Sequence, residues 1–197
     1  MDQHAIALLA GVAAAAIMII IALFAPGLLQ TGGAFSSAKL QFFLWTEVAL
    51  FAYVFLFAAH ALGPPPVVCK PTDPPAVCMP FAPRFPDNLL ILMGLSITAV
   101  TASKARPQPL SLTSRPGFAQ FFQDANGKLT LPKVQMLAWT FVAVGVYLYT
   151  ALKSYAAFHD PTGGTNYPDV DTALLALVGL GQGAFVVNRF IDPESTD

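Results

Sequence analysis

Residues 4–24 form an apolar segment without Asp, Glu, Lys or Arg. As an α-helix rising about 1.5 Å per residue, this segment covers the roughly 30 Å hydrocarbon core of a bilayer. A cleaved signal peptide is the alternative, but Asp2 rather than a Lys or Arg precedes the segment, and no clear cleavage site follows it. We therefore expect a retained transmembrane helix that ends at Pro26 and Gly27.

The chain as a whole is too apolar to form the surface of a soluble protein. Hydrophobic residues make up 55% of its 197 residues, charged residues only 11%, and the mean hydropathy is +0.61. Soluble domains carry about 25% charged residues. The net charge of −1 also argues against nucleic acid as a partner, because phosphates need a basic face to neutralise them.

Four further apolar segments lie between turns rich in Pro and Gly, and they predict helices at about 38–62, 87–104, 131–155 and 170–190. Ser36 or Ser37 can cap the first of these, and Thr130 can cap the third. The expected fold is an all-α integral membrane protein with five transmembrane helices.

Two of these helices begin with nearly the same sequence. The segment KLQFFLWT at 39–46 returns as KVQMLAWT at 133–140, 94 positions later, and the register extends to Tyr53 and Tyr147. The segment LLILMGL at 89–95 is echoed by LLALVGL at 174–180. We expect a tandem repeat of two-helix units related by a pseudo-two-fold axis along the membrane normal.

The repeat divides the chain into five segments. These are an N-terminal helix and loop (1–35), repeat 1 (36–106), a cytoplasmic linker (107–129), repeat 2 (130–191) and an acidic tail (192–197). If the helices alternate in direction, seven of the ten Lys and Arg residues lie on one side: Lys39, Lys104, Arg106, Arg115, Lys128, Lys133 and Arg189. By the positive-inside rule, the linker and C-terminus are cytoplasmic and the N-terminus is outside, in a cell (inner) membrane.

Cys69 and Cys78 lie in the Pro-rich connection within repeat 1, which this topology places outside. In an oxidising compartment we expect a disulfide that fixes the shape of this outer loop. Two free thiols are the alternative. No His lies near them in sequence, and we expect no metal site, cofactor or catalytic set in the chain.

The repeated segment places Gln41 and Trp45 one helical turn apart, followed by Thr46. Gln135, Trp139 and Thr140 repeat this pattern. We expect the two Trp residues to act as interface anchors, and Gln and Thr to hydrogen-bond between helices. The alternative is a polar ring that lines a path across the membrane.

Small residues four apart occupy matching positions in the two repeats, as Gly94 with Thr98 and Gly179 with Gly183. This spacing lets helix backbones approach, so we expect contacts between the repeats or between subunits. The alternative is a constriction, for which Gln182 would supply a polar group inside the span.

Glu47 breaks the repeat, because its counterpart is Phe141. It lies eight residues beyond Lys39, roughly 12 Å along the helix, and an intramembrane carboxylate is a functional-site candidate. A carboxylate that only orients a neighbouring helix is the alternative.

Two functions follow from these patterns. The first is a small membrane subunit that packs into and scaffolds a larger assembly, through small-residue helix contacts and the disulfide-fixed outer loop. The second is a homo-oligomeric ion channel or small-solute transport protein that uses Glu47 and Gln182. The partners are therefore the lipid bilayer and either other membrane subunits or further copies of the chain.

Overall fold

The fold consists of α-helices, seen in a computed structural model that describes residues 2–31, 34–62, 86–105, 118–123, 128–159 and 167–191. The five helices are α1 (Gln3–Phe24), α2 (Ser37–Leu62), α3 (Asp87–Ala105), α4 (Leu131–His159) and α5 (Thr172–Ile191). Two short 3-10 helices, η1 (Pro26–Leu28) and η3 (Phe118–Phe121), and the two-residue antiparallel strands β1 (Gln30–Thr31) and β2 (Ala34–Phe35) complete the described elements. The all-helical prediction is confirmed.

Short polar side chains set where the helices begin. The Asp2 carboxylate accepts a hydrogen bond from the backbone N–H of Ala5 (2.7 Å) at the start of α1. The Asp171 carboxylate accepts one from Ala173 N–H (2.8 Å) at the start of α5. Both side chains satisfy N–H groups that the first turn of a helix leaves without a helical partner.

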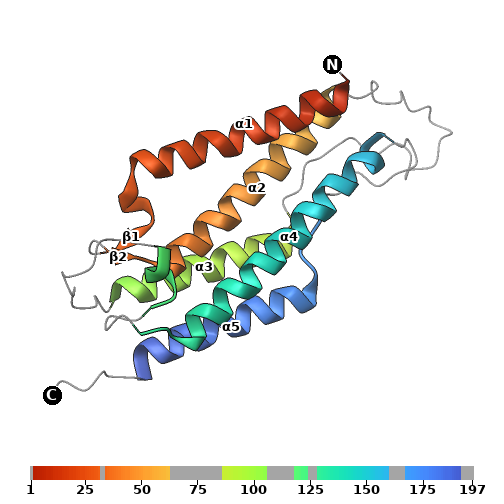
Figure 1. The fold of residues 1–197 in the computed structure, drawn as a ribbon. Helices are drawn as coiled ribbons and strands as arrows, with labels where there is room; N and C mark the ends of the chain where they lie inside the picture. Colours follow the sequence, from red (N-terminus) through yellow and green to blue (C-terminus); the bar gives the residue numbers. More distant parts are fainter. Residues whose placement is uncertain are drawn as a thin grey trace.

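Helices α2, α3, α4 and α5 form a bundle, and α1 lies along the outside of α2 (Figure 1). Within the bundle, α2 packs against α3 and α4, and α5 packs against the same two helices. Figure 1 shows that α1 runs antiparallel to α2. Each end of the bundle is therefore built from segments that are distant in sequence.

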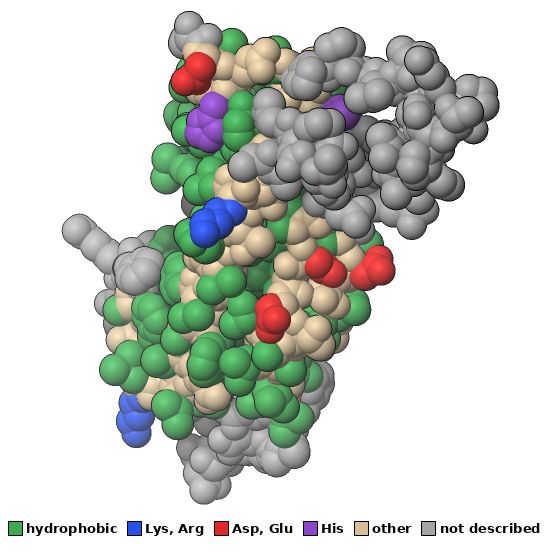
Figure 2. Space-filling view, turned by 90° about the vertical axis from the view of Figure 1, so that its right-hand side faces the viewer, with side chains coloured by type: hydrophobic (Ala, Val, Ile, Leu, Met, Phe, Trp, Pro, Cys, Tyr) green, Lys and Arg blue, Asp and Glu red, His purple; other side chains and the backbone are tan. Residues whose placement is uncertain are grey.

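Three of the described helices are long and apolar enough to cross a membrane, namely α1, α2 and the Leu131–Tyr155 part of α4. The apolar parts found in α3 and α5 are shorter, Asp87–Ala102 and Thr172–Ala184. Hydrophobic side chains cover much of the face seen in Figure 2. Large apolar residues such as Leu23 and Phe24 are exposed, which fits a protein surrounded by lipid.

The interior contains two apolar clusters at successive levels of the bundle. The central cluster joins all four bundle helices and includes Trp45, Val48, Leu89, Leu92, Ala143, Tyr147 and Val178. The end cluster includes Ala38, Ala99, Phe121, Met136 and Leu137, with Val186 packed against it. A third cluster joins α1 to α2 through Ala7, Phe55, Leu56 and Ala59.

Helices α2 and α4 each carry a lysine in the first turn that holds the preceding loop against the helix. The Lys39 ammonium donates to the carbonyl oxygen of Gly27 (3.0 Å) and to that of Gln30. The Lys133 ammonium donates to the carbonyl oxygen of Gln123. An antiparallel backbone pairing precedes each helix, β1 with β2 before α2 and a single Gln123–Leu129 bridge before α4.

Candidate functional site

One buried polar side chain from each bundle helix lies between the central and end clusters. On α2, Gln41 lies between Ala38 of the end cluster and Trp45 of the central cluster. On α3, Ser96 lies between Leu92 and Ala99 in the same way. Both polar side chains are fully buried.

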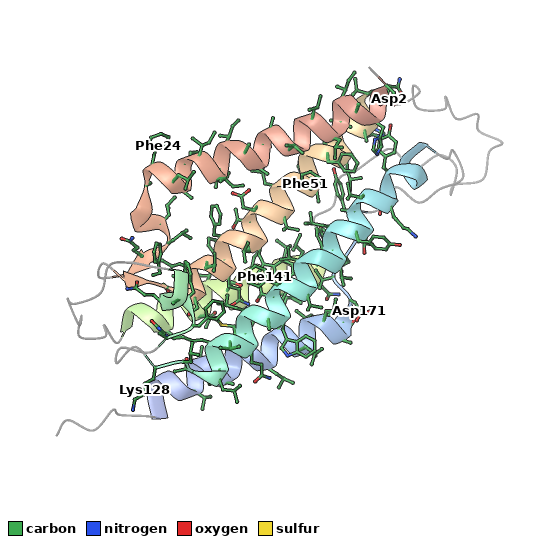
Figure 3. All side chains as sticks on the ribbon, in the orientation of Figure 1. Asp2, Phe24, Phe51, Lys128, Phe141 and Asp171 are labelled. Atoms are coloured by element: carbon green, nitrogen blue, oxygen red, sulfur yellow. The ribbon has the colours of Figure 1, made fainter. Side chains whose placement is uncertain are left out.

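The other two helices follow the same order. On α4, Thr140 lies between Leu137 of the end cluster and Ala143 of the central cluster. On α5, Gln182 lies between Val178 and Val186. Thr140 is fully buried and Gln182 is only 2% exposed. Gln41, Ser96, Thr140 and Gln182 therefore form a polar layer across the bundle. Figure 3 shows the side chains of the described residues on all five helices.

The hydrogen bonds of the polar layer leave several polar atoms unsatisfied. Gln182 Nε2 donates to Ser96 Oγ (3.3 Å), and Thr140 Oγ1 donates to the carbonyl oxygen of Met136 within its own helix (2.8 Å). Among the described residues, Gln182 Oε1, both amide atoms of Gln41 and Trp45 Nε1 have no hydrogen-bond partner. Burying such a group without a partner costs about 1–3 kcal/mol on mutational scales.

The chemistry available in this layer is neutral hydrogen bonding. Its members are two amides and two hydroxyls, with the Trp45 indole one turn beyond Gln41. Side chains of this kind orient helices or hold a neutral polar group, and they supply neither a general base nor an activated nucleophile. Over the described ranges, no group of three or more His, Cys, Asp or Glu side chains is placed to hold a metal ion.

Two glycines of α5 lie at the contacts of this helix with α3 and α4. A Cβ atom placed on Gly181 would lie 3.4 Å from the Met136 backbone, so α4 and α5 are in close contact beside Gln182. A Cβ atom on Gly179 would lie 3.7 Å from Leu95 of α3. The contacts of α5 with α3 and α4 therefore lie next to Gln182 in the sequence.

Glu47 lies on a different side of α2 from the polar layer. Six residues separate it from Gln41, which corresponds to about 9 Å along the helix and about 120° around it. Glu47 is one turn before Phe51, whose ring packs against Gly11 of α1. Glu47 is 8% exposed, and neither carboxylate oxygen has a hydrogen-bond partner in the part of the chain that the structure describes. Glu47 and Gln182 are thus not brought together.

The two copies of the repeated polar segment lie in different surroundings. Gln41 and Trp45 are buried in the bundle, whereas Gln135 is exposed and Trp139 is half-buried. The full burial of Trp45 differs from the lipid-interface position that we expected for it. Thr46 Oγ1 donates to the carbonyl oxygen of Phe42 in its own helix (2.9 Å) rather than to another helix.

The small residues predicted to mediate contacts between the repeats lie partly on the surface. Gly94, Thr98 and Gly183 are exposed, and a Cβ atom added to Gly94 or Gly183 would meet no described atom within 4 Å. The Thr98 hydroxyl donates to the carbonyl oxygen of Gly94 (3.0 Å). Gly94 and Gly183 thus meet no atom of the other repeat among the described residues, and the expected contact between the repeats or between subunits stays a prediction.

The expected disulfide receives no support, because Cys69 and Cys78 lie outside the described residues.

Just before α5, Tyr167 stacks on Tyr53 of α2 with ring centroids 5.4 Å apart. Burial, together with Tyr53, raises the pKa of Tyr167 to about 12. Tyr167 therefore favours its neutral form.

Comparison of the chain with protein-family models, with curated proteins and with solved structures finds no match. Sequence reasoning identified Gln41, Thr140 and Gln182 separately, but not that they share one level with Ser96. It also missed Gly11, although Ala7 and Gly11 have the four-residue spacing of small residues that is typical of close helix contacts.

Proposed function

We propose that the protein is a small integral membrane subunit that packs into and scaffolds a larger membrane assembly. The observation that carries this proposal is the burial of its intramembrane polar groups. Gln41, Glu47 and Gln182 are at most 8% exposed and are enclosed by helices of their own chain. Side chains in such positions orient helices, whereas groups that line a path must face water.

The outward face of α3 supports the same proposal. Gly94, Thr98 and Thr101 are exposed along one side of this helix, and both Thr hydroxyls are already hydrogen-bonded to backbone oxygens of their own helix. Small side chains without free donors let a neighbouring helix backbone approach closely in lipid. This face suits a helix of another subunit.

The proposal includes the tandem repeat, with five membrane spans and the N-terminus outside. Lys39 and Lys133 hold equivalent loops, and α2 packs on α3 as α4 packs on α5. At the opposite end, the Asn88 side chain of α3 donates to the carbonyl oxygen of Val170 before α5 (2.8 Å). The matching lysine contacts at one end of the bundle, and the contact between α3 and the start of α5 at the other end, support a parallel repeat with a pseudo-two-fold axis. A disulfide-fixed outer loop at Cys69 and Cys78 remains part of the proposal.

The experiment is purification from native membranes in a mild detergent, followed by measurement of the native mass. We expect a complex with other polypeptides in fixed stoichiometry. Thr98→Leu should reduce the recovery of these polypeptides, while Leu90→Ile, on the same helix and also exposed, should not. Purification of the chain as a lone monomer would overturn the proposal.

A homo-oligomeric channel or small-solute transporter is the second candidate. The unpaired amide atoms of Gln41 and Gln182 favour it, because they could form part of a polar track through the bundle. Reconstitution in liposomes tests this function. Ion or solute flux that is lost on Glu47→Gln or Gln182→Leu would support the channel, and a tight membrane with the pure protein would exclude it.

A further inference from the structure

We propose that an exposed face of α4, centred on Phe141, Gly145 and Tyr149, binds α1 of a second copy of this chain. This contact rests on the proposed function, because a second copy of the chain would be one partner within the assembly. It starts from the register of the repeat, in which these three residues are the counterparts of Glu47, Phe51 and Phe55 in α2. We call these residues of α4 the open face.

On α2, the equivalent face is covered by α1. A Cβ atom added to Gly11 would lie 3.0 Å from Phe55 Cβ and 3.1 Å from the Phe51 ring, so the two helices are in direct contact. Phe55 and Ala7 are both fully buried. The first repeat therefore has a helix lying on the face that includes Phe51 and Phe55.

On α4, the same face is exposed, and no described helix lies against it. Phe141 is 45% exposed, Tyr149 is 59% exposed, and a Cβ atom added to Gly145 would meet no described atom within 4 Å. The large apolar neighbours Val142, Val146 and Leu152 are exposed as well. Among the described residues, α1 precedes the repeat and no such helix precedes α4, so no described helix covers this face of the second repeat.

The α1 helix of a second copy has the direction and shape that this face requires. Copies inserted in the same orientation place α1 antiparallel to α4, as α1 is to α2 within one chain (Figure 1). The outer side of α1 carries exposed apolar residues, among them Leu9, Val12 and Ile17. In the contact between α1 and α2, the glycine is Gly11 of α1. In the proposed contact, the glycine is Gly145 of α4, so bulky residues of α1 can pack over it.

The ends of the two helices carry opposite charges. In the contact within the chain, the His4 ring of α1 lies 6.0 Å from the Phe55 ring, so the start of α1 is level with the end of α2. The counterpart of Ala59 in α4 is Lys153, which is exposed and whose ammonium lies 4.9 Å over the Tyr149 ring. An α1 helix that lies level with α4, as α1 does with α2, brings Asp2 of the second copy close to Lys153. Contact with lipid chains alone would not need a cation at one end of the open face, so Lys153 favours a helix with an acidic start as the partner.

Cysteine cross-linking in native membranes tests the contact. One tagged chain carries Gly145→Cys and a second chain with a different tag carries Val12→Cys, both with Cys69 and Cys78 replaced by Ser. We expect oxidation to shift both tags to a common band at the mass of a dimer. The matched control replaces Gly145→Cys by Leu180→Cys on the exposed face of α5, and it should leave the two tags at monomer mass.

A second variant removes the dependence on added cysteines. Gly145→Leu should lower the native mass of the assembly by loss of one copy, while Leu180→Phe, at an exposed residue of α5 with no predicted contact, should not. Cross-linking of Gly145→Cys to a different polypeptide, with no dimer, would overturn this inference and leave the proposed function intact. A monomer without any partner would overturn both, and unchanged mass with Gly145→Leu would assign the open face to lipid.

Discussion

The polar layer makes Gln41 the most informative position for a stability measurement. Its side chain is fully buried, and both amide atoms lack a hydrogen-bond partner among the described residues. Replacement by Met keeps an unbranched side chain of similar length and removes the buried amide, so little cavity or strain is created. If the amide is held without partners, Gln41→Met removes a cost of about 1–3 kcal/mol. The free energy of unfolding should rise by that amount.

The assay is reversible unfolding by SDS in mixed micelles, followed through the fluorescence of Trp45 and Trp139, the two tryptophans of the chain. The matched control is Gln135→Met, at the repeat counterpart of Gln41, which is exposed. A surface substitution of this kind should change stability by less than about 0.5 kcal/mol. A loss of 1 kcal/mol or more in Gln41→Met would refute the reasoning, because it would mean that the amide has a strong partner inside the bundle.

Three further outcomes follow from the described contacts. Gly11→Val should destabilise the chain by about 1–3 kcal/mol in the same SDS assay because its methyl groups meet α2, whereas Gly94→Val should have little effect, and equal values for the two would show that α1 does not pack closely. Since the folded pKa of Tyr167 is about 12 against an ordinary value of 10, the unfolded chain ionises first, so stability should be intact below pH 10 and fall between pH 10 and 12. Tyr167→Phe should reduce that fall, measured by thermal unfolding across this pH range, and the exposed Tyr149→Phe should not. Lys133→Met should release the loop before α4 and raise its susceptibility to proteolysis, and an unchanged cleavage rate would count against the role of the Lys133–Gln123 contact.

The positions of the helices could be predicted from the sequence because their causes are local. The uncharged run at 4–24 and the turn residues between the other apolar segments predicted α1 to α5 to within about four residues at each end. The predicted cap at Ser36 is confirmed, since its hydroxyl accepts a hydrogen bond from Lys39 N–H (3.5 Å). Capping and chain breaking depend on a few neighbouring residues, so one sequence contains enough information for them.

The surroundings of the polar side chains could not be predicted in the same way. Gln41 and Gln135 have the same neighbours at the repeated positions, yet the first is buried and the second is exposed. The difference comes from packing between distant segments, because Gln41 lies between the two apolar clusters of the bundle, whereas Gln135 lies on an outward side of α4. Burial of a helix face depends on which other helices lie against it, and a repeated segment does not carry that information.

The contacts of α5 have a consequence for biosynthesis. Asn88 is hydrogen-bonded to the carbonyl oxygen of Val170, 82 residues later, and Ser96 accepts from Gln182, 86 residues later. During synthesis, α3 is therefore made long before the groups that complete its polar contacts. The Ser96–Gln182 contact can form only after residue 182 has been translated. A chain that ends with α4 would leave the Asn88 side chain without the Val170 carbonyl oxygen to which it donates in the folded bundle.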